Sequence, residues 1–164
     1  MGNRATVIFQ AEDAISPAVY LHWNGGPESV YQFLDELDRR KVRADADYEV
    51  ARFVQLVGEF FDQGIGFNGL SLGVSQGPAA ITPDELAQVQ TDHGDNGFYI
   101  VDRTVKPTKV RRFFATWDQR TQRETVREVC AADVTLEHAE ARAHKYANGD
   151  FAEFYKRICP TIRG

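Results

Sequence analysis

The stretch Val19-Tyr20-Leu21-His22-Trp23-Asn24-Gly25-Gly26-Pro27-Glu28-Ser29 decides how the first half of this chain folds. A run of aliphatic and aromatic residues stops at two glycines, and a proline follows at once. Adjacent glycines allow backbone conformations that are closed to other residues, and proline suits a first helical turn because its missing N–H is not needed there. The stretch therefore predicts a buried strand that turns directly into a helix.

Hydrophobic patterns on both sides of this corner predict its neighbours. Residues 4–10 (RATVIFQ) alternate as a strand does, and the short loop after them favours an antiparallel pair with the strand at 18–23. Apolar residues at helical spacing predict a helix over 27–40 and a second helix from Asp45 or Asp47 to about residue 61. Both apolar stripes are typical of helices that pack on a core.

The second half of the chain carries shorter patterns. They predict a strand at 70–74, a short helix at 83–90, a hairpin of 98–103 with 110–117, and helices at 135–147 and 151–158. Residues 123–130 fit a strand and a short helix equally well. We therefore expect a single α+β domain: a mostly antiparallel sheet, two long amphipathic helices packed on it and a C-terminal helical segment.

Bulk composition supports one globular domain outside the membrane. The chain has 164 residues, of which 43% are hydrophobic, and no apolar run is long enough to span a bilayer. The N-terminus lacks the apolar segment of a secretory signal. Cys130 and Cys159 are isolated, which is typical of reduced thiols. Together these features predict a cytoplasmic protein.

Charge divides the chain into an acidic part and a basic part. Residues 1–101 hold six lysines and arginines against fifteen acidic residues, and residues 102–128 hold eight against four. We expect an acidic α+β core over 1–101, with the basic hairpin and C-terminal helices of 102–164 in the same domain. Such a chain either pairs its own halves or offers a basic face to an acidic partner.

The glycine corner is the first candidate site. A strand that ends at two glycines before a helix leaves backbone N–H groups unpaired, and these can hold a phosphate or a carboxylate. The candidate ligand-binding residues are His22, Asn24, Gly25, Gly26 and Ser29. A purely structural role remains open, because glycines also let a helix pack tightly on a sheet.

The same corner resembles the SGGxDS loop of the PP-loop ATP pyrophosphatases, where glycines and hydroxyls hold the nucleotide phosphates. Four positions match that loop in type or nearly so: Asn24, Gly25, Gly26 and Ser29. That family winds a parallel sheet with helices, and residues 41–47 (KVRADAD) do not supply the strand that such a crossover needs. The resemblance implies a nucleotide-handling enzyme as an alternative function, with His22, Asn24 and Ser29 at its site.

A basic ribbon is the second candidate site. Cationic residues lie on the hairpin predicted over 98–117, with aromatic residues between them. The candidate partner-contacting residues are Arg103, Lys106, Lys109, Arg111, Arg112 and Trp117. Two-stranded ribbons enter nucleic-acid grooves, and aromatic side chains beside arginines stack on bases. The alternative is a solvated face balanced by the acidic half.

Other chemistry finds little support in the sequence. Asp92-His93-Gly94-Asp95-Asn96 contains metal-ligating residue types, but one loop supplies too few ligands, and turn chemistry explains the same residues. No HExxH, Walker loop or GxSxG motif is present. We expect no metal, no cofactor and no catalytic residue.

Met1-Gly2-Asn3-Arg4-Ala5, the LHWNGG corner and the helix end at 52–61 together resemble a group of small uncharacterised phage and mobile-element proteins. The resemblance covers roughly residues 1–101, including GLSLGV and DNGFYIV. It implies a counter-defence or host-interaction factor, located in the host cell cytoplasm if the chain is phage-encoded. We therefore expect a small binding protein for a phosphate-bearing ligand, a nucleic acid or a host protein. The alternatives are the nucleotide-handling enzyme and a self-associating structural component.

Overall fold

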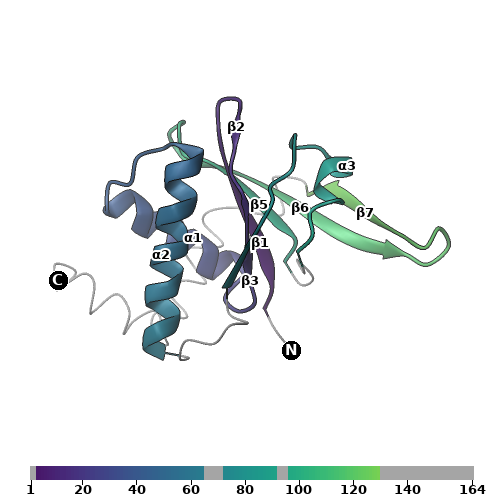
Figure 1. Ribbon diagram of the computed structural model, residues 1–164, viewed down its shortest axis with the longest axis horizontal. Coiled ribbons are helices and arrows are strands. Elements are labelled where there is room, and N and C mark those ends of the chain that lie inside the picture. The colour runs from purple at the N-terminus through teal and green to yellow at the C-terminus, as the bar shows by residue number, and fades with distance from the viewer. Residues whose placement is uncertain (1–2, 65–71, 92–95, 130–164) are drawn as a thin grey trace.

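The computed structural model describes residues 3–64, 72–91 and 96–129 of this chain. They form one sheet with three helices (Figure 1). The strands are β1 (Ala5–Ala11), β2 (Ala14–Ile15), β3 (Ala18–Leu21), β4 (Leu72–Ser75), β5 (Phe98–Asp102), β6 (Lys109–Asp118) and β7 (Arg123–Glu128). The helices are α1 (Pro27–Arg39), α2 (Ala46–Gly64) and α3 (Pro83–Leu86).

The strand order is β4-β3-β1-β5-β6-β7, with β2 paired to β1. Every pair is antiparallel except β1 with β5, which run parallel. The predicted α+β fold with a mostly antiparallel sheet is therefore confirmed. The parallel pair joins residues about ninety positions apart, such as Val7 and Tyr99, so no local pattern announces it.

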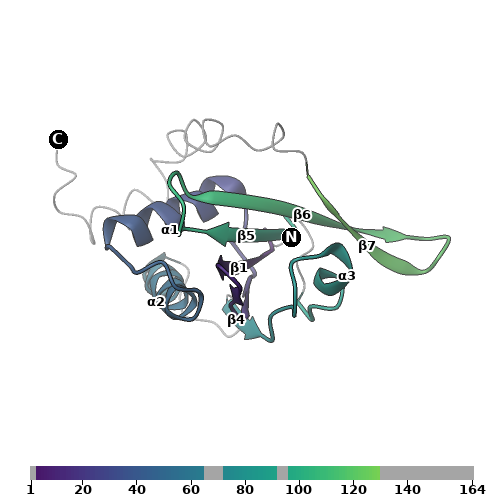
Figure 2. The ribbon, with the colours of Figure 1, turned by 90° about the horizontal axis from the view of Figure 1, so that it is seen from above.

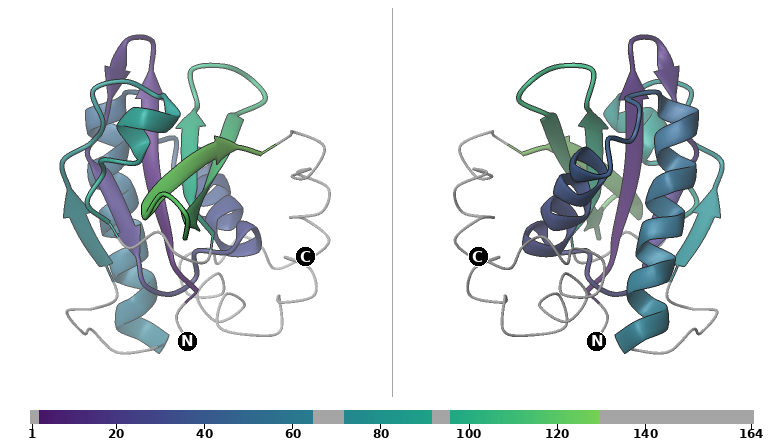
Figure 3. Two further views of the ribbon diagram at one scale, coloured as in Figure 1. Left: turned by 90° about the vertical axis from the view of Figure 1, so that its right-hand side faces the viewer. Right: turned by 90° about the vertical axis from the view of Figure 1, so that its left-hand side faces the viewer.

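Strand alternation divides the core between the two faces of the sheet. On β1, Val7 and Phe9 pack with α1 and α2, whereas Ile8 packs on the opposite face with Leu86 of α3. Figure 3 shows α1 and α2 together on one side of the sheet, and α3 on the other side. Both faces of the central strands are buried, which explains the unbroken apolar runs Val7–Phe9 in β1 and Phe98–Val101 in β5.

The two long helices bury the predicted apolar stripes. Phe33 of α1 and Phe53 of α2 meet edge to face with ring centroids 6.0 Å apart, and Phe53 also meets Phe9 of β1 at 5.4 Å. Edge-to-face contacts of this kind add to the stabilisation that burial itself provides. The stripes are therefore core, and the helix axes are fixed by aromatic packing.

Several shorter elements differ from the sequence-based expectations. Within the segment 123–130, Arg123–Glu128 form the strand β7; α3 is a single turn that ends at Leu86, and β2 is an additional short strand. The helices expected at 135–147 and 151–158, both cysteines and most of the 92–96 loop lie outside the described residues. Among the described residues, no helix has the length and apolarity needed to cross a bilayer.

Strands β6 and β7 extend past the rest of the sheet. Only Lys109 to Phe113 of β6 pair with β5, whereas Phe113 to Asp118 pair with β7. The outer part of this hairpin projects away from the body of the domain (Figures 1 and 2). We call residues 114–127 the outer ribbon.

Candidate functional site

Gly25 closes the glycine corner against the first strand. Its N–H donates to the Asn3 carbonyl at 2.7 Å, and its carbonyl accepts from the Tyr99 hydroxyl at 2.8 Å. A Cβ at Gly25 would lie 2.6 Å from the Asn3 oxygen and 2.6 Å from the Ala5 Cβ. Glycine is required here because two backbone segments approach each other closely, and its N–H is already engaged.

The other polar groups of the corner also bond within the protein. The Asn24 side-chain amide donates to the Ser29 hydroxyl at 3.3 Å, and Ser29 is buried. The Gly26 carbonyl accepts from the N–H groups of Ser29 and Val30, both at 3.0 Å. Asn24 itself has a left-handed φ of 57°, which asparagine tolerates well. This arrangement supports the structural interpretation of the corner, and the anion site there stays a prediction.

His22 lies beside the corner with an aromatic environment. Its Nδ1 is 2.6 Å from the Tyr20 hydroxyl, and its ring meets Trp23 at a centroid distance of 4.8 Å. His22 and Trp23 are both half-buried. The structure thus brings His22 together with a tyrosine, and no hydrogen bond joins it to a carboxylate in the described part of the chain.

The six residues of the predicted basic ribbon separate into three groups. Arg103 and Arg112 are buried in the domain. Lys106 and Arg111 are held in ion pairs, with Asp38 at 3.0 Å and Glu128 at 2.8 Å respectively. Lys109 and Trp117 are exposed. Burial removes the first group from any contact with a partner, so the outward-facing candidates lie further along the hairpin.

Arg112 connects the hairpin to the glycine corner through an aromatic ring. Its guanidinium carbon lies 4.2 Å from the centroid of Tyr99 and 4.8 Å from that of Phe114, and Nη2 donates to the Asn96 carbonyl at 2.6 Å. The Tyr99 hydroxyl in turn bonds to Gly25. Stacking on aromatic faces is a common way of accommodating a buried guanidinium, so Arg112 supports the fold.

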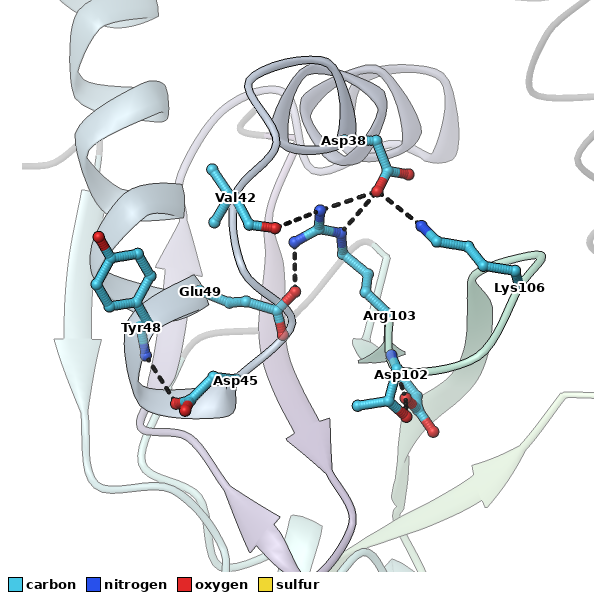
Figure 4. A network of polar contacts seen from close by, with 9 residues as sticks. Asp38, Val42, Asp45, Tyr48, Glu49, Asp102, Arg103 and Lys106 are labelled. Carbon is cyan, nitrogen blue, oxygen red and sulfur yellow. Dashed lines mark hydrogen bonds and ion pairs between the residues drawn. The ribbon is translucent and has the colours of Figure 1, made fainter.

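Arg103 is the centre of a buried polar network (Figure 4). Its guanidinium donates to the Glu49 carboxylate, to Asp38 Oδ1 at 2.8 Å and to the Val42 carbonyl at 3.1 Å. Lys106 donates to the same Asp38 oxygen at 3.0 Å. The network joins the end of β5 to both helices and to the loop between them. Hydrogen bonds from Arg103 and Lys106 outweigh burial and hold the pKa of Asp38 below its ordinary value.

Glu49 is the most perturbed group of this network. Its side chain is fully buried, and its Oε2 has no hydrogen-bond partner among the described residues. Burial raises the pKa of Glu49 from 4.5 to about 7, against the pull of Arg103 and with a further push from Asp102 and Asp38. A buried carboxyl with one unsatisfied oxygen favours its protonated form near neutral pH.

We expect Glu49 to make the protein less stable as the pH rises through about 7. The raised pKa means that the folded state holds a proton that the unfolded state has lost, so the stabilisation is complete below about pH 4.5 and disappears above pH 7. The Glu49 carboxyl accounts for about 3 kcal/mol between pH 5 and pH 8, because one pKa unit corresponds to about 1.4 kcal/mol. Urea unfolding of wild type and Glu49→Gln at both pH values isolates this contribution. The contributions of all other titrating groups are present in both proteins and cancel when the two free energies of unfolding are subtracted. Equal pH dependence of the two proteins would contradict it.

The outer ribbon carries the exposed cationic and aromatic side chains. Trp117 is 61% exposed, the largest exposed fraction among the exposed large hydrophobic residues described. Arg120, Arg123 and Arg127 are exposed, and their side chains form no ion pair with any described residue. Arg120, Arg123 and Arg127 lie beyond the hairpin that the sequence predicts over 98–117. The sequence did not decide between a strand and a helix for residues 123–130, so it gave no sign that they extend this hairpin.

Sequence reasoning missed the role of Glu49, although one signal was present. Glu49 lies three residues after Ala46 and four before Phe53, on the apolar stripe of α2. A carboxylate in a stripe that packs on the core needs a buried cation, and Arg103 fulfils that need. The described residues contain no group of three or more histidine, cysteine or acidic side chains placed to bind a metal ion.

Comparisons with known proteins identify no relative that bears on this site. The chain matches no protein-family model, no curated protein and no solved structure.

Proposed function

We propose that this protein binds nucleic acid through the outer ribbon. The observation that supports the proposal is Trp117, 61% exposed on a two-stranded hairpin that projects beyond the sheet. Exposing a large aromatic side chain at the far end of a hairpin contributes nothing to the core. A partner that covers the indole explains its position.

The charges around Trp117 favour a polyanionic partner. In the register of the ribbon, Trp117 lies opposite Glu124 on one face, whereas Arg123 and Arg127 lie on the other face with Thr116 and Thr125. A ribbon inserted into a groove presents both faces at once, so that arginines contact phosphates while the indole stacks on a base. Fifteen of the 24 acidic residues belong to positions 1–101, and the outer ribbon itself holds three arginines against Asp118 and Glu124.

Replacing Trp117 by alanine is expected to weaken binding of a short single-stranded oligonucleotide at low salt. Loss of one base–aromatic stack corresponds to about 1–3 kcal/mol, or roughly a fivefold to hundredfold rise in Kd. Fluorescence anisotropy of a labelled oligonucleotide measures this effect. The matched control is Val74→Ala, which removes another exposed hydrophobic side chain, on the edge strand β4.

Salt dependence distinguishes phosphate contacts from other contacts. Arg123→Gln and Arg127→Gln should each lower the slope of log K against log salt by about one, because each releases about one fewer counterion. Two results would contradict the proposal: no binding of any oligonucleotide at low salt, or an equal loss in Val74→Ala. In the first case a host protein becomes the partner to seek for the same ribbon.

A further inference from the structure

A second cationic region lies at the opposite end of the domain, where α1 ends and α2 begins (Figure 1). A pocket of about 460 Å³ opens there between the last residues of α1, the loop and the outer face of α2. Its polar lining consists of Arg40, Lys41, Arg43, Tyr48, Arg52 and Gln55, which we call the basic pocket. We propose that the basic pocket binds a phosphate-bearing small molecule.

One wall of the basic pocket is built by a chain of hydrogen bonds. Arg40 donates to the buried Glu36 at 2.7 Å and to Glu59 at 3.0 Å. Gln55 donates to the other oxygen of Glu59 at 3.3 Å and accepts from Arg52 at 2.7 Å. This chain fixes Arg52 relative to the end of α1, so the wall exists before any ligand arrives. Such preorganisation reduces the entropy that a ligand must overcome on binding.

The Arg52 guanidinium lines the pocket and has no carboxylate partner among the described residues. Its guanidinium donates to Gln55 and, at 3.3 Å, to the Tyr48 hydroxyl, and both acceptors are uncharged. Arg43 and Arg52 lie 5.4 and 5.3 Å from the centroid of the Tyr48 ring. The hydrogen bond and the charge of Arg52, assisted by Arg43, lower the pKa of Tyr48. Cations gathered around one half-exposed ring favour the arrival of an anion.

Lys41 occupies a position where a helix usually places glycine. Its φ is +54°, its N–H donates to the Asp38 carbonyl, and the next N–H, of Val42, donates to Leu37. These two bonds define a Schellman motif, in which the left-handed residue is most often glycine. The lysine therefore costs backbone energy, and its side chain forms no ion pair with any residue in the described ranges. A role for its ammonium group in the basic pocket accounts for its presence.

The chemistry of the lining selects the ligand. Three guanidinium groups and one ammonium group surround a hollow whose size is ordinary for small-molecule sites. Arg40 is paired with Glu36 and Glu59, and Arg43 is paired with Asp45 at 3.0 Å. The Arg43 pair is weak because both of its members are exposed. Guanidinium forks match phosphate oxygens, and more than one cation favours an anion with more than one phosphate group. The basic pocket thus offers a phosphate two charged donors, Lys41 and Arg52, that have no carboxylate partner among the described residues.

Isothermal titration of the full-length protein with pyrophosphate tests this inference at low salt. We expect saturable binding at one site, weakened about tenfold or more by Arg52→Gln, because a charged hydrogen bond contributes about 1.5–3 kcal/mol. Lys41→Gly is the sharper variant. Glycine relieves the left-handed backbone, so the melting temperature should stay equal or rise while pyrophosphate affinity falls about tenfold. Lys41→Arg keeps the charge and should retain binding.

Lys109→Gln, which removes one exposed positive charge outside both the basic pocket and the outer ribbon, is the matched control and should leave pyrophosphate affinity unchanged. A second arm uses phosphatidylcholine vesicles that contain phosphatidylinositol bisphosphate. Binding to these vesicles without binding to free pyrophosphate overturns the small-molecule assignment in favour of a lipid headgroup. Absence of saturable binding, or equal losses in Arg52→Gln and Lys109→Gln, overturns the site itself. Neither result bears on the outer ribbon, whose test uses different variants and a different ligand.

Discussion

Replacement of Arg103 by leucine is expected to lower the free energy of unfolding by about 3–5 kcal/mol at pH 8. The guanidinium is almost fully buried and holds Glu49, Asp38 and the Val42 carbonyl together. Leucine leaves the buried Glu49 carboxylate without its cation and the Val42 carbonyl without this donor. Removing one partner of a buried pair costs far more than removing an exposed charge, because the remaining group keeps its desolvation penalty.

A double-mutant cycle shows whether the Glu49 carboxylate causes the loss. In a Glu49→Gln background, Arg103→Leu should cost about 1–2 kcal/mol less, since no buried charge remains to be neutralised. Lowering the pH from 8 to 5 should reduce the cost in the same direction, because Glu49 then takes up a proton. Urea unfolding followed by circular dichroism measures all four proteins.

Arg123→Leu provides the control for loss of a guanidinium at an exposed position. Its side chain contacts no described carboxylate, so the change should stay within about 0.5 kcal/mol of wild type. If Arg103→Leu were equally harmless, the network of Figure 4 would not hold the helices to the end of β5.

The parts of the fold that sequence predicted are those written in short-range patterns. The stripe from Val30 to Leu37 repeats at helical spacing, and the glycine pair at 25–26 marks the turn from β3 to α1. Residues 123–128 gave no decision because six residues with alternating charge fit a strand and a helix alike. These residues form β7 because they pair with β6, and the pattern within residues 123–128 contains no information about that pairing.

The candidate site depended on contacts that short-range patterns do not contain. Glu49 and Arg103 are separated by 54 positions, and only the packing of α2 beside β5 brings them together. Sequence therefore gave Arg103 and Arg112 as candidate partner contacts, with a solvated face as the alternative, although the fold buries both side chains. The exposure of Trp117 was equally hidden, because strand alternation fixes which residues share a face but not which part of a strand passes the edge of the domain.

Gly25→Ala is expected to destabilise the fold by about 1–3 kcal/mol, whereas Gly58→Ala in α2 is expected to stabilise it by up to about 1 kcal/mol. A Cβ at Gly25 meets the Asn3 oxygen, the Ala5 Cβ and, at 2.7 Å, the Ala5 backbone nitrogen, so backbone rather than a mobile side chain must move. A Cβ at Gly58 has nothing within 4 Å, and alanine is the better helix former. Thermal and urea unfolding of Gly25→Ala and Gly58→Ala measures both effects. The same substitution then distinguishes a glycine required by close backbone contact from a glycine that only weakens a helix.

The result also decides how the glycine corner is to be tested for anion binding. If Gly25→Ala is as destabilised as expected, any loss of ligand binding in that variant reports damage to the β1–β3 contact. The informative variants are then His22→Ala and Asn24→Gly, since His22 is half-buried and Asn24 already has a left-handed backbone. If Gly25→Ala is instead as stable as wild type, the corner is looser than its 2.7 Å hydrogen bond implies. Its backbone N–H groups would then be free to turn toward an anion, and the phosphate site predicted at Asn24–Ser29 would gain the support that the packed corner denies it.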